Sequence, residues 1–221
     1  MTTRREEISG NLAEVRAKIP QDRTLIVVTK TFPISDLEIL YQLGERNFGE
    51  NRDSEAAEKA QALPKDLIWH YQGEIQSQKI RSIVSWADYI HSLDEITHAR
   101  KISTIAAEAK KTQKVFIQIS LDPEPGSRGG INPIDVDRFT EELLQLPHIE
   151  IAGVMGIAPL QGDPARAFAQ LQALSEQVSH IAPDATAISA GMSHDYEIAL
   201  RFGATHLRIG SSILGSRTPQ T

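Results

Sequence analysis

The 221-residue sequence has no cysteine, no long apolar run and no excess of basic residues. The absence of cysteine excludes disulfides, iron–sulfur clusters and thiol nucleophiles. No apolar segment approaches the roughly 20 residues of a membrane span, and no apolar signal region follows Met1–Glu7. The 29 acidic and 23 basic residues give a net charge of −6, which disfavours a general nucleic-acid surface. We therefore expect a cytoplasmic protein that binds neither nucleic acid nor membrane.

The overall composition is that of an ordinary soluble globular protein. Apolar residues make up 40% of the chain and charged residues 24%. A chain of 221 residues can form one full-sized domain with a substantial core. Because neither a linker nor a shift in composition divides the sequence, we expect a single domain over residues 1–221. No long apolar face is left over after the helices are assigned, so we expect a monomer.

Short apolar segments alternate with helix-length segments along the whole chain. The expected strands cover about 25–30, 46–48, 66–70, 89–91, 114–119, 149–154, 186–189 and 206–209. The expected helices cover about 4–18, 35–43, 52–63, 77–84, 94–110, 134–145, 164–180 and 193–202. Helix-length connections between strands imply parallel pairing with right-handed crossovers. Eight such units predict an α/β fold, a single (β/α)8 TIM-like barrel, with a doubly wound open sheet as the alternative.

The most informative stretch is Leu25-Ile26-Val27-Val28-Thr29-Lys30. Four apolar residues, mostly β-branched, predict a strand that is buried on both faces. Lys30 closes this strand, at the edge where parallel α/β folds build their active sites. A partly desolvated ammonium loses its proton more readily, and the neutral amine can form an imine with an aldehyde or ketone. The simpler alternative is a lysine that extends from the strand end into solvent.

The loops after the last two expected strands are rich in small residues. Gly191-Met192-Ser193 precedes one helix, for which Ser193 is the expected N-cap, and Gly210-Ser211-Ser212 can begin a short helical turn. In a barrel these two loops commonly bind phosphate through backbone N–H groups at helix starts. Ser193 and Ser211 would add hydroxyl donors. The alternative is a pair of ordinary capped helices with glycine turns.

Two further charged residues lie in or beside expected strands. Arg208 belongs to the last strand and must point either into the site or out to solvent. Inside, its permanent charge would make it a donor to a heteroaromatic nitrogen, which would then stay unprotonated. Glu50 is either a general acid or base or, more simply, a solvated or helix-proximal carboxylate. A lysine imine, a phosphate site and an arginine facing a ring nitrogen together describe a site for pyridoxal 5′-phosphate.

These motifs, in this order, resemble the small pyridoxal phosphate homeostasis proteins of the YggS/PROSC type, which share the barrel of the alanine racemase N-terminal domain. The resemblance covers nearly the whole chain. The matching residues are Val28-Thr29-Lys30-Thr31 with Pro33, Phe48-Gly49-Glu50-Asn51, Trp69-His70 with Gly73, Ile75-Gln76-Ser77 with Lys79, His91-Ser92, Gly191-Met192-Ser193 with Asp195, and Arg208-Ile209-Gly210-Ser211 with Gly215.

The resemblance implies a role for each of seven residues. Lys30 would carry the cofactor as an internal aldimine, and Ser193 with Gly210-Ser211 would hold the phosphate. Arg208 would face the pyridine nitrogen. Asn51 would lie near the cofactor and Met192 would line the phosphate loop. The chain departs from the family pattern at Phe32, Arg52 and Gln78, where a lysine, a tyrosine and an asparagine are usual.

The function that the resemblance implies is cofactor binding and supply, without robust catalysis and with apoenzymes that use the cofactor as possible recipients. One alternative is an amino-acid racemase of low activity. Racemisation needs a base on each face of the substrate, and in alanine racemase the second base is a tyrosine supplied with another domain and subunit, which we do not expect in this sequence. The other alternative is a barrel enzyme that forms a lysine imine with a sugar phosphate. The spacing of the histidines matches no metal-binding motif, so we expect no metal site.

Overall fold

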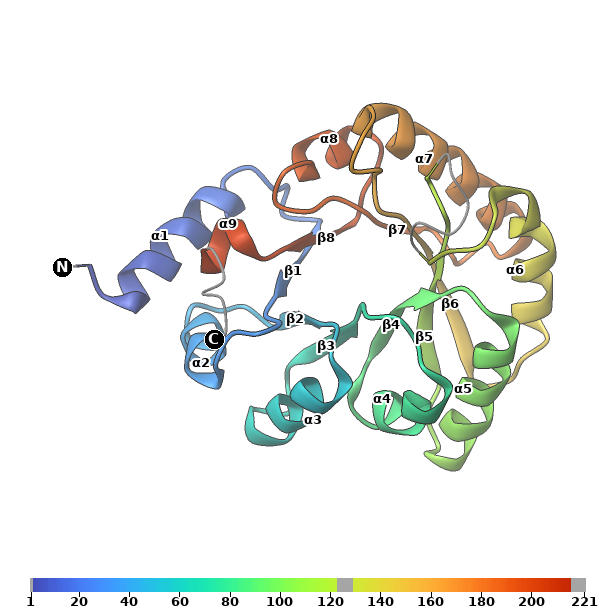
Figure 1. The fold of residues 1–221 in the computed structure, drawn as a ribbon, viewed down its shortest axis with the longest axis horizontal. Coiled ribbons are helices and arrows are strands. Elements are labelled where there is room, and N and C mark those ends of the chain that lie inside the picture. Colours follow the sequence, from blue (N-terminus) through green and yellow to red (C-terminus); the bar gives the residue numbers. More distant parts are fainter. Residues whose placement is uncertain (1, 123–128, 216–221) are drawn as a thin grey trace.

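Eight parallel strands close into a barrel in the order of the sequence, and β1 pairs with both β2 and β8. The computed structural model describes residues 2–122 and 129–215. The helices form a ring outside the strands (Figure 1). The (β/α)8 prediction is confirmed, and the alternative of an open sheet is wrong because β8 returns to pair with β1 over four positions.

Strands and helices alternate along the chain, and short 3-10 helices, η1 and η2, precede α4 and α6. The strands are β1 (Thr24–Val28), β2 (Asn47–Glu50), β3 (Ile68–Tyr71), β4 (Tyr89–Leu93), β5 (Gln113–Gln118), β6 (Ile149–Met155), β7 (Ala187–Ser189) and β8 (His206–Ile209). The helices are α1 (Arg4–Arg16), α2 (Ile34–Gln42), α3 (Asp53–Ala62), η1 (Ser77–Lys79), α4 (Ile80–Trp86), α5 (Ile96–Glu108), η2 (Pro133–Asp135), α6 (Val136–Leu144), α7 (Pro164–Ile181), α8 (Tyr196–Arg201) and α9 (Ser211–Leu214).

The first strand shows why the apolar pattern forms a barrel. Leu25, Ile26 and Val27 are at most 1% exposed. Strand residues alternate between the barrel interior and the layer of helices, so a strand covered on both sides needs a continuous apolar run. Burial of each such side chain stabilises the fold by roughly 1.5–3 kcal/mol. The strand ends at Val28, and Thr29 and Lys30 follow at the carboxyl-terminal edge of the barrel.

Two predicted loop and cap positions are wrong. The second strand does not end before Gly49-Glu50, because these residues pair with His70 and Tyr71 of β3. The helix after β4, expected from about residue 94 with Ser92 or Asp94 as its cap, begins at Ile96 and is capped by neither residue. Ser92 lies within β4, and the Asp94 carboxylate instead accepts a hydrogen bond from the Gly130 N–H.

The first and last helices of the described chain lie side by side (Figure 1). Arg4 Nη2 donates to the carbonyl oxygen of Leu214 at 2.9 Å, and Asn11 Nδ2 donates to that of Ile213 at 3.0 Å. Polar side chains of α1 thus satisfy carbonyl groups at the end of α9, which would otherwise lack partners. This packing holds α9 in place, and with it Ser211, the first residue of that helix. Within residues 2–122 and 129–215, no helix has the length and apolarity that a membrane span requires.

Candidate functional site

All seven residues singled out from the sequence line one cavity of about 250 Å³ at the carboxyl-terminal edge of the strands. The seven are Lys30, Asn51, Met192, Ser193, Arg208, Gly210 and Ser211. They come from β8 and from the loops that follow β1, β2, β7 and β8. The remaining lining residues are Val28, Phe32, Gln72, Met155, Ile157, His194 and Gly215. The structure therefore assembles a lysine amine, an arginine, two serine hydroxyls and two amides around one space.

Arg208 points into the barrel rather than out to solvent. The residue is only 5% exposed. Its guanidinium donates from Nη1 to Ser189 Oγ at 2.6 Å and from Nη2 to the carbonyl oxygen of Gly156 at 2.9 Å. Burial lowers the pKa of Arg208 to about 10, and the nearby Asp195 opposes that shift. Arg208 is therefore a fixed, protonated donor beside the cavity near neutral pH.

Arg208 is also one end of a chain of hydrogen bonds through the barrel interior. Ser189 Oγ lies 2.8 Å from His91 Nδ1, His91 Nε2 lies 2.9 Å from His70 Nδ1, and His70 Nε2 lies 3.0 Å from Asn47 Oδ1. Arginine only donates, and a carbonyl oxygen only accepts. The Asn47 oxygen therefore takes a hydrogen from His70, and because each neutral ring carries one N–H, every bond points from Arg208 toward Asn47. This direction fixes each histidine as a neutral ring protonated on Nε2.

The histidines of the interior are held uncharged by burial. Desolvation lowers the pKa of His70 and His91 well below 6.5 and that of His206 to about 4. His70 stacks on Tyr89 and His91 stacks on Phe116, with ring centroids 4.9 and 4.3 Å apart. At the sequence level His70 and His91, at strand ends, are expected to be polar core or rim residues, and the structure buries both in the core. Together with Arg208 they form a hydrogen-bonded polar layer inside the barrel, next to the cavity that Arg208 lines.

The turn after β7 differs from its prediction in one respect. Ser193 is not the N-cap of the next helix, because α8 begins later and its N-cap is Asp195. The Asp195 carboxylate accepts from the Met192 N–H at 2.6 Å and so closes the turn. Gly191 has φ +87°, and a Cβ there would lie 2.8 Å from the Tyr196 Cα, so only glycine fits.

Ser193 is instead joined to the turn after β8. Its Oγ accepts from the Ser212 N–H at 3.3 Å, which leaves its own hydrogen for a donor role. Ser211 begins the short helix α9, as expected from the sequence. Gly210 packs so closely on β1 that a Cβ would lie 3.0 Å from the Val28 carbonyl oxygen. The two turns therefore form one surface of small residues, with two hydroxyl groups from neighbouring strand ends.

Asn51 and Gln72 carry polar atoms that are buried but unmatched. Asn51 Oδ1 and Gln72 Nε2 have no hydrogen-bond partner among the described residues. Both side chains line the cavity. A buried polar atom without a partner costs roughly 1–3 kcal/mol, which a polar ligand can recover. The acceptor of Asn51 and the donor of Gln72 lie in the same cavity as Lys30. They suit a small ligand that carries oxygen and nitrogen atoms.

Gln72 was missed in the sequence, although its position held a usable signal. It follows Tyr71 at the end of β3, as Asn51 follows Glu50 at the end of β2. Residues just beyond parallel strands face the same edge of a barrel. The family resemblance in this stretch rests instead on Trp69 and His70, which are buried within the strand.

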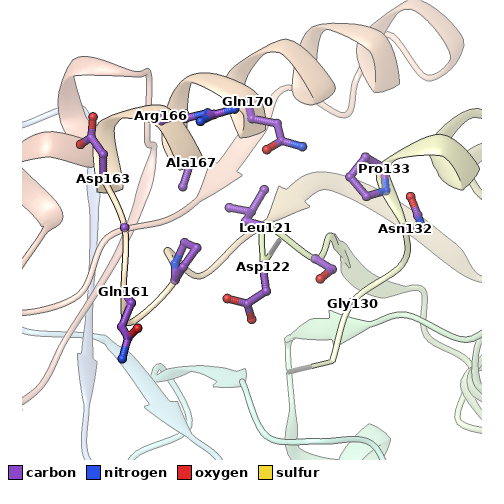
Figure 2. Close-up of a pocket in the computed structure, with 13 residues that line it drawn as sticks. Leu121, Asp122, Gly130, Asn132, Pro133, Gln161, Asp163, Arg166, Ala167 and Gln170 are labelled. Carbon is purple, nitrogen blue, oxygen red and sulfur yellow. The ribbon is translucent and has the colours of Figure 1, made fainter. Parts of the chain in front are cut away.

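A larger cavity of about 540 Å³ lies elsewhere at the same edge of the barrel (Figure 2). It is enclosed by the loops after β5 and β6 and by the start of α7, and includes Asp122, Gln161 and Arg166. No lysine is among its described lining residues, and none of the seven predicted residues reaches it. The smaller cavity, which unites an amine with converging donors, is therefore the candidate site.

The donor set of the smaller cavity fits pyridoxal 5′-phosphate. Serine hydroxyls and backbone at the starts of helices suit a phosphate dianion, a lysine amine suits an aldehyde, and a protonated arginine suits an unprotonated ring nitrogen. Val28, Met155 and Ile157 supply apolar walls for a ring. The unmatched amide atoms of Asn51 and Gln72 offer further polar contacts.

Comparison with known proteins points in the same direction. Residues 4–218 match the family described as "Alanine racemase, N-terminal domain". The "Pyridoxal phosphate homeostasis protein" of Mycobacterium leprae is 35% identical over 241 residues, with 96% of this chain and 93% of that protein covered. The solved structure of PipY from Synechococcus elongatus with PLP bound has a TM-score of 0.87 and 35% identity, and covers 94% of this chain and 100% of PipY.

A more distant comparison concerns the fold alone. Alanine racemase of Clostridium difficile superposes with a TM-score of 0.80 at 16% identity, covering 97% of this chain and 58% of that enzyme. The barrel is therefore the same, as the sequence resemblance implied.

Proposed function

The chain belongs to the alanine racemase N-terminal domain family and, within it, to the pyridoxal phosphate homeostasis proteins, and from this premise we propose that it binds pyridoxal 5′-phosphate and serves in the homeostasis of that cofactor. The observation that carries the proposal is the convergence of Lys30, Arg208 and the Ser193–Ser211 surface on one cavity. PipY, a relative of similar length, has been solved with PLP bound.

Each lining residue has a separate task in this proposal. When bound, the cofactor supplies an aldehyde that reacts reversibly with amines. Lys30 Nζ would hold the aldehyde carbon through a C=N bond, formed with release of water. Ser193, Gly210 and Ser211 would bind the phosphate, with Met192 beside them. Arg208, held by Ser189 and Gly156, would donate to the ring nitrogen, and Asn51 would contact the cofactor through its unmatched amide oxygen.

The arrangement supports holding the cofactor rather than turning over a substrate. A protonated arginine leaves the ring nitrogen an unprotonated acceptor, and such a ring withdraws electrons poorly from a carbanion. The relatives carry names of homeostasis proteins, not of enzymes. We propose the same for this chain, against the alternative of an amino-acid racemase with low activity. Exchange of the α-hydrogen of alanine or serine for deuterium at enzyme-like rates would contradict this part of the proposal.

The remaining features of the proposal concern the whole protein. We propose one domain over residues 1–221 and a monomer in the cytoplasm, with apoenzymes that use pyridoxal phosphate as possible recipients. The modest net charge of −6 suits a freely diffusing protein. A stable dimer in light scattering would contradict the monomer.

Replacing the proposed attachment residue tests the function. The wild-type protein with added pyridoxal phosphate is expected to show a visible absorption band that borohydride abolishes, and Lys30→Ala is expected to lack that band because no amine remains at the cavity. Lys65→Ala, at an exposed lysine after α3, is the matched control and should behave as the wild type. A colourless wild-type protein that takes up no pyridoxal phosphate would overturn the proposal in favour of a sugar-phosphate imine enzyme.

A further inference from the structure

A cluster of three charged side chains, two of them buried and the third partly exposed, contacts both residues that flank Lys30. Lys59 of α3 is 4% exposed, and its Nζ donates to Glu50 Oε1 at 2.7 Å and to Glu55 Oε1 at 2.6 Å. A third bond, of 2.9 Å, goes to the carbonyl oxygen of Thr29. Lysine has three ammonium hydrogens, and all three are used. Glu50 is fully buried and bonded to Lys59 of α3, so it is not solvated, and the expectation of a helix-proximal carboxylate is the one confirmed.

The residue before Lys30 is held by three bonds. The Thr29 N–H donates to the carbonyl oxygen of Gly49 at 2.9 Å, which continues the pairing of β1 with β2. Thr29 Oγ1 donates to Glu50 Oε1 at 2.7 Å. The Thr29 carbonyl oxygen accepts from Lys59, as described above. Neither its peptide groups nor its side chain can rotate without breaking a buried bond.

The residue after Lys30 is held in an unusual conformation. Thr31 has φ +70°, in the left-handed region that β-branched residues rarely adopt. Its N–H donates to Glu55 Oε1 at 2.6 Å. Strained backbone of this kind persists where surrounding contacts determine it, and it gathers at functional sites. Here the determining contact comes from the same carboxylate that binds Lys59.

The cluster has no other function visible in the structure. It lies outside the lining of the cavity, so it does not contact a ligand there. A buried ion pair contributes little net stability, because desolvation offsets most of its Coulomb energy. Burial raises the pKa of Glu50 and the Lys59 charge opposes that shift, so the ionised carboxylate depends on its partner.

We propose that Lys59, Glu50 and Glu55 are positioning residues for Lys30, which fix the backbone on both of its sides so that its amine is directed into the cavity. This role rests on the proposed function of Lys30. A fixed backbone restricts the positions that the amine can reach, so less conformational entropy is lost on attachment, and the cluster raises both the rate and the affinity of cofactor attachment.

The sharpest test is Glu55→Ala, because Glu55 is partly exposed and its loss leaves Lys59 paired with Glu50. Titration with pyridoxal phosphate, followed by the visible band, is expected to give at least a tenfold weaker dissociation constant and a slower approach to equilibrium. Glu55→Gln keeps an acceptor for the Thr31 N–H and should restore most of the affinity. Glu58→Ala, on the exposed side of the same helix, is the control and should match the wild type.

Two further measurements separate positioning from stability and from the proposed function. The free energy of unfolding of each apo variant is measured by denaturant titration. If Glu55→Ala loses stability but keeps cofactor affinity within twofold of the wild type, the positioning role is wrong.

If the wild-type protein binds no pyridoxal phosphate, the proposed function fails, and the positioning role is then judged on the apo protein. The rate at which Lys30 is alkylated by a small aldehyde with cyanoborohydride, read by mass spectrometry, should fall at least fivefold in Glu55→Ala. An unchanged rate would overturn the inference.

Discussion

Lowering the pH from about 7.5 to about 5.5 is expected to remove about 4 kcal/mol from the free energy of unfolding through three histidines alone. His70, His91 and His206 have pKa values lowered by burial, so each stays neutral in the folded protein. In the unfolded chain each regains a pKa near 6.5 and takes up a proton below it. The stability they contribute is therefore complete above pH 6.5 and is lost as the pH falls toward their folded pKa values.

Two carboxyl groups act against this loss. Burial raises the pKa of Glu50 and Asp94, so these groups favour the folded state as the pH falls. The loss through the histidines still dominates, because keeping one histidine neutral at one pH unit below 6.5 lowers the free energy of unfolding by about 1.4 kcal/mol. The whole free energy of unfolding of a typical domain is roughly 5–15 kcal/mol.

Denaturant unfolding at the two pH values measures the effect. His206→Asn should reduce the pH dependence by about one third, since one of the three protons is no longer taken up. His180→Gln, at an exposed position on α7, should leave it unchanged. A free energy of unfolding that changes by less than about 1 kcal/mol between the two pH values would refute the neutral-histidine interior.

Pyridoxal, which lacks the phosphate, is expected to bind at least about 100-fold more weakly than pyridoxal phosphate. A phosphate dianion at the Ser193–Ser211 surface would accept at least two charge-assisted hydrogen bonds, each stabilising the complex by roughly 1.5–3 kcal/mol. Two such bonds correspond to a factor of about 100 or more in the dissociation constant. The Ser193 hydroxyl, which already accepts from Ser212, keeps its hydrogen for this purpose.

A pair of variants locates the phosphate. Ser211→Ala should weaken pyridoxal phosphate about tenfold and leave pyridoxal unaffected, because only the former reaches this hydroxyl. Ser54→Ala, at an exposed position of α3, serves as the control. Equal affinities of the wild-type protein for the two compounds would show that the turns after β7 and β8 do not bind phosphate.

The sequence was most informative where a chemical group directly follows a strand. Lys30 was recognisable because it follows a strand at the edge where the carboxyl ends of parallel strands meet. Asn51 was implied by the family resemblance, and the structure brings both residues to one cavity with those of β8 and its loop. Gln72 obeys the same rule, since it directly follows β3. That all these residues bind a cofactor stays a prediction.

The supporting residues could not have been predicted in the same way. Lys59 and Glu55 lie four residues apart on a polar, alanine-rich helix, a pattern typical of a solvated face. The burial of Lys59 arises from the packing of α3 against β2 and from its bonds to Thr29 and Glu50, which no local pattern encodes. The bond between His91 and Ser189 likewise joins residues 98 positions apart, and it depends on which side chains face the barrel interior.

The central claim is that the amine of Lys30 holds pyridoxal phosphate, and one measurement tests it most directly. The protein is mixed with pyridoxal phosphate, reduced with borohydride, digested and mapped by mass spectrometry. The account predicts a single dominant site carrying a phosphopyridoxyl group, at Lys30, and no such group at the buried Lys59. Modification spread over exposed lysines, or concentrated at a lysine other than Lys30, would contradict it.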